Sequence, residues 1–186
     1  MTDQEASDAD LALRSRAGDK RSFDSLVSRY KAPLYQFARR YVGNPDEAYD
    51  ILQETFVAAW LALERYDHQR PFATWLRAIA LNKCRDHGRR LAVRNRVHRL
   101  FSDLASIIGP EPTPERAEAG LLQHLDDAIA ALPAFYKEPL LLTLVGGLSQ
   151  QEAALQLRTT PKAVEMRISR ARKKLTEALS DLQGEG

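Results

Sequence analysis

The residues with the clearest chemistry are polar and basic side chains, together with one methionine, near the carboxyl end, spaced to share one face of a helix. They are Lys162, Met166, Ser169, Arg170 and Lys173. At 100° per residue this face lies opposite an apolar stripe. Such a helix fits the DNA major groove, where its first side chains reach base edges and later Arg and Lys contact phosphates. The pattern therefore predicts duplex DNA binding, with a merely solvated amphipathic helix as the alternative.

The residues before this face predict the turn that would present it. Ser149 and Glu152 have the spacing of a capping box, which starts a short helix. Thr160 can cap a second helix, and Pro161 suits its first position, where a missing N–H costs nothing. The inward stripe of that second helix consists of Val164, Ile168, Ala171 and Leu175. Together these signals predict a helix-turn-helix.

A second basic face lies in the middle of the chain. Between residues 77 and 99 the only acid is Asp86, among the bases Arg77, Lys83, Arg85, Arg89, Arg90, Arg94, Arg96 and Arg99. Phe72 and Trp75 precede it, after a polar loop over residues 66–71. Aromatic rings beside a basic face suit single-stranded or opened nucleic acid, because bases stack on rings while Arg contacts phosphates. At this spacing, however, the two rings are more often core residues than stacking platforms.

A third face is acidic and lies on the helix expected over 45–65. Its heavy apolar stripe is expected to be core: Tyr49, Leu52, Phe56, Trp60 and Leu63. The far side carries Asp46, Asp50 and Glu54 beside the aliphatic residues Val57 and Leu61. A mixture of acids and aliphatic groups is typical of a protein interface. An ordinary solvated surface remains the alternative.

Composition limits the classes of protein. The chain has 186 residues, 44% of them hydrophobic and 28% charged, with a net charge of +2, so affinity for nucleic acid must come from local clusters. No apolar run can span a bilayer and the acidic N-terminus is unlike a signal peptide, which predicts a cytoplasmic protein without membrane insertion. Cys84 is the only cysteine and is expected to be a small buried residue. No catalytic residue, metal site or cofactor is predicted.

The periodicity predicts an all-α fold of two small helical domains joined by a flexible linker. Helices are expected over 8–17, 20–41, 45–65, 72–97, 121–131, 134–145, 149–157 and 161–182. Pro33 should kink or interrupt the second of them. Three prolines between residues 110 and 114 mark the linker. The predicted domains are 8–97 and 121–183, with the linker at 98–120.

Several stretches in order carry a resemblance to a known family. They are DILQETFVAAW at 50–60, FATWLRAIALN at 72–82 with Asp86 and Arg89-Arg90 after it, Leu132-Pro133, Gly147-Leu148-Ser149, and RISRAR at 167–172. Across residues 8–182 the chain resembles the extracytoplasmic function (ECF) group of bacterial RNA polymerase sigma factors, in the sigma-70 family. The resemblance implies that 8–97 is sigma region 2 and 121–183 is region 4, with no region 3 domain.

The resemblance also implies roles for individual residues. Residues docking on the clamp helices of the β′ subunit of core RNA polymerase would be Asp50, Gln53, Glu54, Val57 and Leu61. Residues opening the promoter −10 element and holding its separated strand would be Tyr66, His68, Arg70, Trp75, Arg77, Asn82, Arg85, Asp86, Arg89 and Arg90. Residues reading the −35 element as duplex would be Lys162, Glu165, Met166, Arg167, Ser169, Arg170 and Lys173. Further partners implied are the β subunit and an anti-sigma factor.

This chain departs from the family pattern in region 4. Arg158 stands where the turn usually has glycine, Lys162-Ala163 replaces a common Gly-Thr, and Glu165 occupies a position that is often basic. Two other classes compete with the sigma-factor hypothesis. A two-domain helix-turn-helix regulator would explain region 4 but not the acidic face at 45–65. A helical metal-dependent hydrolase would need converging ligands, whereas the histidines are scattered along the chain.

Overall fold

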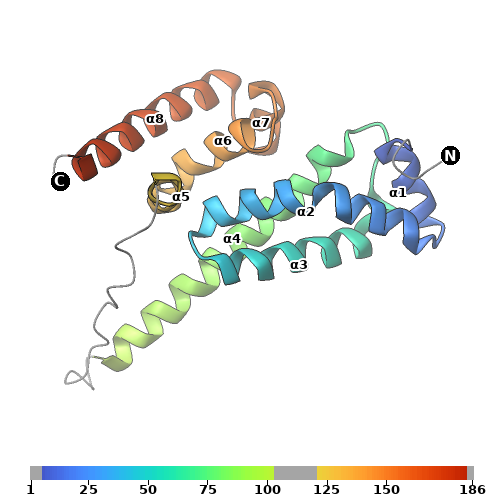
Figure 1. Ribbon diagram of the computed structural model, residues 1–186, viewed down its shortest axis with the longest axis horizontal. Helices are drawn as coiled ribbons and strands as arrows, with labels where there is room; N and C mark the ends of the chain where they lie inside the picture. The colour runs from blue at the N-terminus through green and yellow to red at the C-terminus, as the bar shows by residue number, and fades with distance from the viewer. Residues whose placement is uncertain (1–5, 103–120, 184–186) are drawn as a thin grey trace.

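The computed structural model describes the backbone of residues 6–102 and 121–183, and the side chains of residues 6–93 and 124–180. All regular elements in these ranges are helical (Figure 1). They are α1 (Asp8–Arg16), α2 (Lys20–Val42), α3 (Pro45–Ala62), the single 3₁₀ turn η1 (Leu63–Arg65), α4 (Phe72–Ser102), α5 (Leu121–Ala131), α6 (Ala134–Leu144), α7 (Gln150–Gln156) and α8 (Pro161–Gln183). The predicted all-α class is confirmed.

The helix starts follow the capping signals in the sequence. The Asn44 side chain accepts hydrogen bonds from the backbone N–H groups of Asp46 and Glu47, at 2.9 and 3.1 Å, and so opens α3. Ser149 and Glu152 form the predicted capping box of α7. At α8, the Thr160 hydroxyl accepts from the Ala163 N–H at 3.2 Å. Each cap satisfies N–H groups that have no partner within the helix.

The N-terminal unit consists of α1 to α4, with α2 and α3 packed on each other and both on α4 (Figure 1). One prediction for α3 is wrong: Tyr49, placed in the core stripe, is 47% exposed. The buried face instead centres on small and medium side chains: Ala48, Ile51, Leu52, Thr55 and Ala59. Small residues let α2 and α4 approach α3 closely, so the helix is rotated toward them and away from Tyr49.

Two features of the long helices differ from expectation. Helix α2 is not interrupted at Pro33. Pro33 is exposed, so water can satisfy the carbonyl that its missing N–H leaves free. Helix α4 continues to Ser102, into the stretch assigned to the linker. The rest of that predicted linker, residues 103–120, lies outside the described residues.

The C-terminal unit consists of α5 to α8. The predicted inward stripe of α8 is confirmed, because Val164, Ile168, Ala171 and Leu175 are all buried. Helix α2 of the first unit also packs against α5 and α6 of the second. At this junction Gly43 adopts φ +82°, and a Cβ on it would lie 2.9 Å from the Ala130 Cβ. The two units therefore meet closely where α2 ends.

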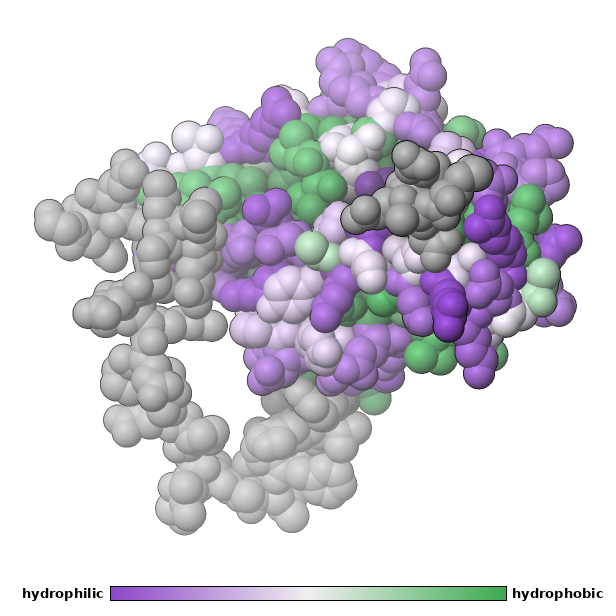
Figure 2. Space-filling model, turned by 45° about the vertical axis from the view of Figure 1, so that its right-hand side comes forward, coloured by the Kyte–Doolittle hydropathy of each residue, from purple (hydrophilic) through white to green (hydrophobic). Residues whose placement is uncertain are grey.

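The outer surface is mainly polar. In the view of Figure 2, hydrophilic residues cover most of the face, with smaller hydrophobic areas among them. Within the described part of the chain, no helix is long and apolar enough to cross a membrane.

Candidate nucleic-acid interface

Helix α8 presents most of the predicted duplex-binding residues to solvent. Lys162, Met166, Ser169, Arg170 and Lys173 are exposed on one side, opposite the buried stripe. Two acids moderate this basic face. The Glu165 carboxylate lies 3.0 Å from the Lys162 ammonium, and the Glu177 carboxylate lies 3.8 Å from that of Lys173. Exposed pairs of this kind are weak and exchange readily for phosphate contacts.

Arg167 is placed differently from the other predicted −35 residues. Its guanidinium carbon lies 4.0 Å from the centre of the Phe135 ring on α6, an arrangement that favours a cation–π contact. Its Nη2 donates to the Thr159 hydroxyl at 3.4 Å. Arg167 therefore ties α8 to α6 and to the turn, and it is half-buried.

The turn between α7 and α8 forms a Schellman motif with arginine in the left-handed position. The Thr159 N–H donates to the Ala154 carbonyl at 2.9 Å, and the Arg158 N–H donates to the Leu155 carbonyl at 3.3 Å. Arg158 has φ +52° and is the only non-glycine residue with positive φ in the described part of the chain. Arg158 thus occupies, at a conformational cost, the position where glycine is usual in this motif.

The loop before α4 is held by an aromatic cluster. The Tyr66 ring centre lies 5.4 Å from that of Phe72 and 5.0 Å from that of Trp75. The Tyr66 hydroxyl donates to the Arg70 carbonyl at 2.6 Å. Tyr66 is only 6% exposed and Phe72 is buried, whereas His68 and Arg70 are exposed. The core reading of Phe72 is confirmed, and Tyr66 shapes the loop from within.

The predicted strand-opening residues of α4 fall into two groups. Asn82, Arg89 and Arg90 are exposed, and Arg89 is hydrogen-bonded to the half-buried Asp86. Arg77 is half-buried; burial lowers its pKa, which nearby Tyr30 and Glu152 act to raise.

Arg85 has a partner that was not foreseen. Its Nε and Nη2 donate to the two carboxylate oxygens of Glu138 on α6, at 2.8 and 2.5 Å. This hydrogen-bonded pair raises the pKa of Arg85. The sequence had no signal for it, because the two residues are 53 positions apart.

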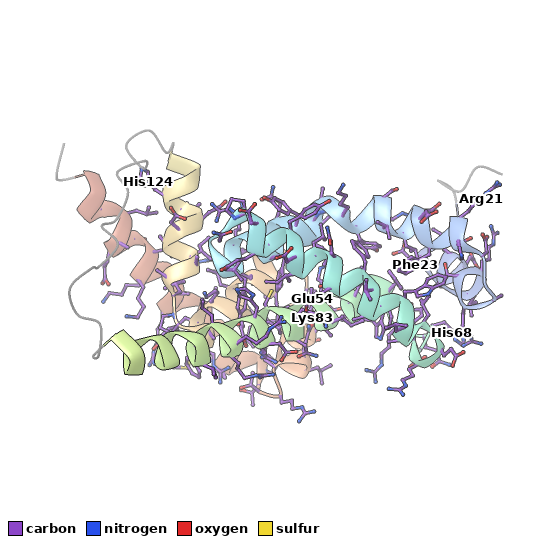
Figure 3. All side chains as sticks on the ribbon, turned by 90° about the horizontal axis from the view of Figure 1, so that it is seen from below. Arg21, Phe23, Glu54, His68, Lys83 and His124 are labelled. Atoms are coloured by element: carbon purple, nitrogen blue, oxygen red, sulfur yellow. The ribbon has the colours of Figure 1, made fainter. Side chains whose placement is uncertain are left out.

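The acidic face of α3 is exposed as predicted and continues onto α4. Val57 is 60% and Leu61 is 77% exposed, and both line an open hollow of about 400 Å³ with Asp50 and Gln53. The Glu54 carboxylate lies 3.5 Å from the Lys83 ammonium and 3.2 Å from Arg90 Nη2. Figure 3 shows Glu54 and Lys83 side by side between the two helices, with His68 at a distance. Lys83 on α4 thus joins the acidic face to the basic one.

Comparison with known proteins identifies this arrangement. The sigma-70 region 2 family matches residues 26–94, and a sigma-70 region 4 family matches residues 122–175. The RNA polymerase sigma factor NccH of Alcaligenes xylosoxydans xylosoxydans is 39% identical over 98% of this chain and 100% of its own. The chain is an ECF sigma factor of the sigma-70 family. This sigma factor is also 39% identical to CnrH of Cupriavidus metallidurans, over 97% of this chain and 98% of CnrH.

The same assignment holds across more distant relatives and in three dimensions. The ECF sigma factor SigW of Bacillus subtilis is 31% identical over 90% of this chain and 94% of its own. The solved structure of CnrH in complex with the cytosolic domain of CnrY has a TM-score of 0.68 at 35% identity, covering 94% of this chain and 97% of that one. Sigma factors are transcription initiation factors, so this sigma factor works with RNA polymerase at promoters.

Proposed function

We propose that this sigma factor divides its work among three surfaces, each assigned to specific residues. The face of α3 with Asp50, Gln53, Glu54, Val57 and Leu61 docks on the β′ clamp helices of core polymerase. The 66–71 loop and α4 open the −10 element and hold one strand. Helix α8 reads the −35 element as duplex. In this scheme residues 8–97 act as region 2 and residues 121–183 as region 4.

The exposed aliphatic pair on α3 is the observation that carries this proposal. Val57 and Leu61 lie beside acids on a surface that no described helix covers. Exposed apolar groups next to charge favour a protein partner. The α4 and α8 basic faces serve a different partner, since Arg and Lys there are spaced for phosphates and base edges. A regulator acting alone would have no use for the α3 face.

The two DNA surfaces are separated experimentally by the state of the DNA that each one meets. Arg89→Ala and Arg85→Ala should impair strand opening, because their contacts form only once the bases unstack. Arg170→Ala should weaken −35 binding by roughly 1 to 3 kcal/mol if it contacts a base edge. Transcript yield is measured with purified core polymerase on a duplex promoter and on the same promoter with a pre-opened −10 bubble.

The bubble should rescue the Arg85 and Arg89 variants more than the Arg170 variant. Equal rescue of all three, or rescue of Arg170→Ala alone, would mean that the two surfaces are assigned wrongly. The promoter sequence for both templates is found beforehand, by serial selection from a random library with the wild-type holoenzyme.

A protein partner that restrains this sigma factor is part of the same proposal. CnrH, its 39% identical relative, has been solved in complex with the cytosolic domain of CnrY. We infer that an anti-sigma factor binds this sigma factor in the cytoplasm, where core polymerase and promoter DNA are. Co-purification of this chain with candidate anti-sigma domains tests the inference, and the α3 face offers the first set of substitutions.

A further inference from the structure

Region 4 covers part of the strand-opening face of region 2 through a set of buried charges. Glu138 on α6 is only 8% exposed and accepts from Arg85 through both carboxylate oxygens. The Tyr41 hydroxyl, from α2, donates to the same carboxylate at 3.1 Å. Burial, together with the charge of Glu138, raises the pKa of Tyr41, so its hydroxyl keeps its proton. Every partner of this carboxylate in the described residues comes from region 2.

The neighbouring residue on α6 makes a second buried contact. Lys137 is 7% exposed, and its ammonium donates to the carbonyl oxygens of Tyr41 at 2.8 Å and Ala130 at 2.5 Å. Nearer the surface, Arg40 on α2 donates to the Asp126 carboxylate on α5 at 2.8 Å. A buried charge is costly unless it is paired or hydrogen-bonded, so these contacts favour one docked arrangement of the two regions.

The docked arrangement also reaches the rest of the α4 face. A cleft of about 300 Å³ is lined on one side by Asn82 and Arg85, and on the other by Gln156 and Arg158 from α7 and its turn. Glu152 on α7 also acts electrostatically on Arg77. Two half-buried residues assigned to the −10 strand, Arg77 and Arg85, thus lie toward region 4, and the exposed Asn82 lines the cleft between the two regions.

The geometry points to an autoinhibitory contact in which the Glu138 carboxylate occupies Arg85 as a DNA phosphate would. A guanidinium binds carboxylate and phosphate through the same two parallel N–H donors, so both cannot hold those donors together. While region 4 is docked, Arg85 is closed to a DNA strand. Release of the Arg85–Glu138 pair, when the two regions separate, makes Arg85 available. This inference rests on the proposed role of Arg85 in strand binding.

The test compares two substitutions that break the same ion pair from opposite sides. Glu138→Gln removes the competing charge and leaves Arg85 in place, whereas Arg85→Ala removes the arginine itself. Full-length protein without polymerase is titrated with a fluorescent single-stranded DNA oligonucleotide of mixed sequence over a range of salt. Asp24→Asn, an exposed acid on α2, makes the same change in net charge and is the matched control.

Only Glu138→Gln should tighten binding of the single strand. We expect the affinity for the single strand to rise roughly threefold to tenfold. The slope of log affinity against log salt concentration should become steeper by about 0.7, the value for one added phosphate contact on single-stranded DNA. Arg85→Ala and Asp24→Asn should show neither change. Adding Arg85→Ala to Glu138→Gln should abolish the gain. A gain that survives Arg85→Ala, or one equalled by Asp24→Asn, overturns the proposal.

Separation of the regions is followed in the same proteins by energy transfer between dyes. Exposed positions Ser28 on α2 and Thr176 on α8 are replaced by cysteine for labelling, and the buried Cys84 stays unlabelled. Glu138→Gln and Arg85→Ala should both lower transfer efficiency. Unchanged transfer in both variants would show that the Arg85–Glu138 pair does not hold the two regions together. Lowered transfer without tighter DNA binding by Glu138→Gln would show that the pair does not block binding of single-stranded DNA.

A second variant protects the test against misfolding. If Glu138→Gln loses helical circular dichroism, Asp126→Asn is used instead, because it breaks the partly exposed Arg40–Asp126 pair at the same junction. Asp126→Asn must then give the same Arg85-dependent gain in affinity for the single strand. Failure of the autoinhibitory contact is distinguishable from failure of the proposed function. If Arg85→Ala transcribes normally with core polymerase, the proposed role of Arg85 in strand binding is wrong. If Arg85→Ala transcribes poorly but the effects on the free protein are absent, only the autoinhibitory contact is wrong.

Discussion

Arg158 shows how one residue departs from the usual chemistry of its turn. It has φ +52° at the left-handed position of the Schellman motif after α7. The corresponding position after α1 is Gly18, with φ +96°, and there the same motif carries no penalty for a Cβ. The chain therefore contains both versions of the turn.

Replacing Arg158 by glycine should stabilise the C-terminal unit. We expect about 1 kcal/mol, because the substitution removes the clash between Cβ and the backbone in the left-handed region. The measurement is urea unfolding followed by circular dichroism. Arg158→Ala is the control, since it shortens the side chain but keeps the Cβ and should give no such gain. Equal stabilisation by both would assign the effect to the arginine side chain.

Cys84 provides a second check on a single residue. Burial raises the pKa of its thiol to about 12. At pH 8 about one Cys84 thiol in ten thousand is then ionised, against roughly a quarter in an unfolded chain. A disulfide reagent should therefore react slowly with native protein and quickly in guanidinium chloride. The chain has no other cysteine to confuse the readout, and fast native reaction would contradict the burial of Cys84.

Helix α3 is an element with two well-separated faces. Its small residues pack against α2 and α4, while its acids and aliphatic groups face outward. The structure decides which substitutions can test this face without disturbing the fold. Reversing the charge of Glu54 would set a third cation beside Lys83 and Arg90, so it would disturb the fold as well as the surface. Val57 and Leu61 are the better probes.

Val57→Ala with Leu61→Ala should weaken binding to core polymerase by at least about tenfold. Truncating two apolar groups at the centre of an interface costs about 1 kcal/mol or more each. Stability should hardly change, because both side chains are exposed in the free protein. Affinity is measured by fluorescence anisotropy with core enzyme, and Val93→Ala, also exposed at 63%, is the control on α4. Unchanged affinity would remove this face from the interface.

At the scale of the whole molecule, the charge distribution is expected to limit DNA binding by the free protein. Net charge is only +2, acids lie beside several of the bases, and region 4 holds Arg85. We therefore expect the proposed −10 and −35 surfaces to bind promoter DNA only weakly until the two regions separate.

Free full-length protein should show little preference for its own promoter over random duplex. The expected preference is below about tenfold at physiological salt, against the 10³ or more that is typical of specific DNA-binding proteins. Competition gel shifts with the promoter found by library selection measure it. Tight, sequence-specific binding without polymerase would instead favour the two-domain regulator.

The local pattern of the sequence was sufficient to locate the helices and to assign the faces of α8. Helix periodicity depends only on backbone geometry, so the inward stripe of α8 and its outward bases follow from residue spacing. Caps are also local: Asn44, Ser149 and Thr160 act on residues two or three positions away. The order of the sigma-factor motifs was readable for the same reason, because each is a short contiguous stretch.

Only tertiary packing decided which faces meet and which charges pair. Tyr49 looked like core, but close packing of small residues turned α3 and left it exposed. Arg85 looked like a free DNA contact, yet it pairs with a carboxylate 53 positions away. Helical spacing predicts which side of its own helix a side chain occupies, but it does not predict which other helix packs against that side. The partners of Arg85, Lys83 and Lys137 were set by the burial of apolar surface between helices, which brings distant charges within bonding distance.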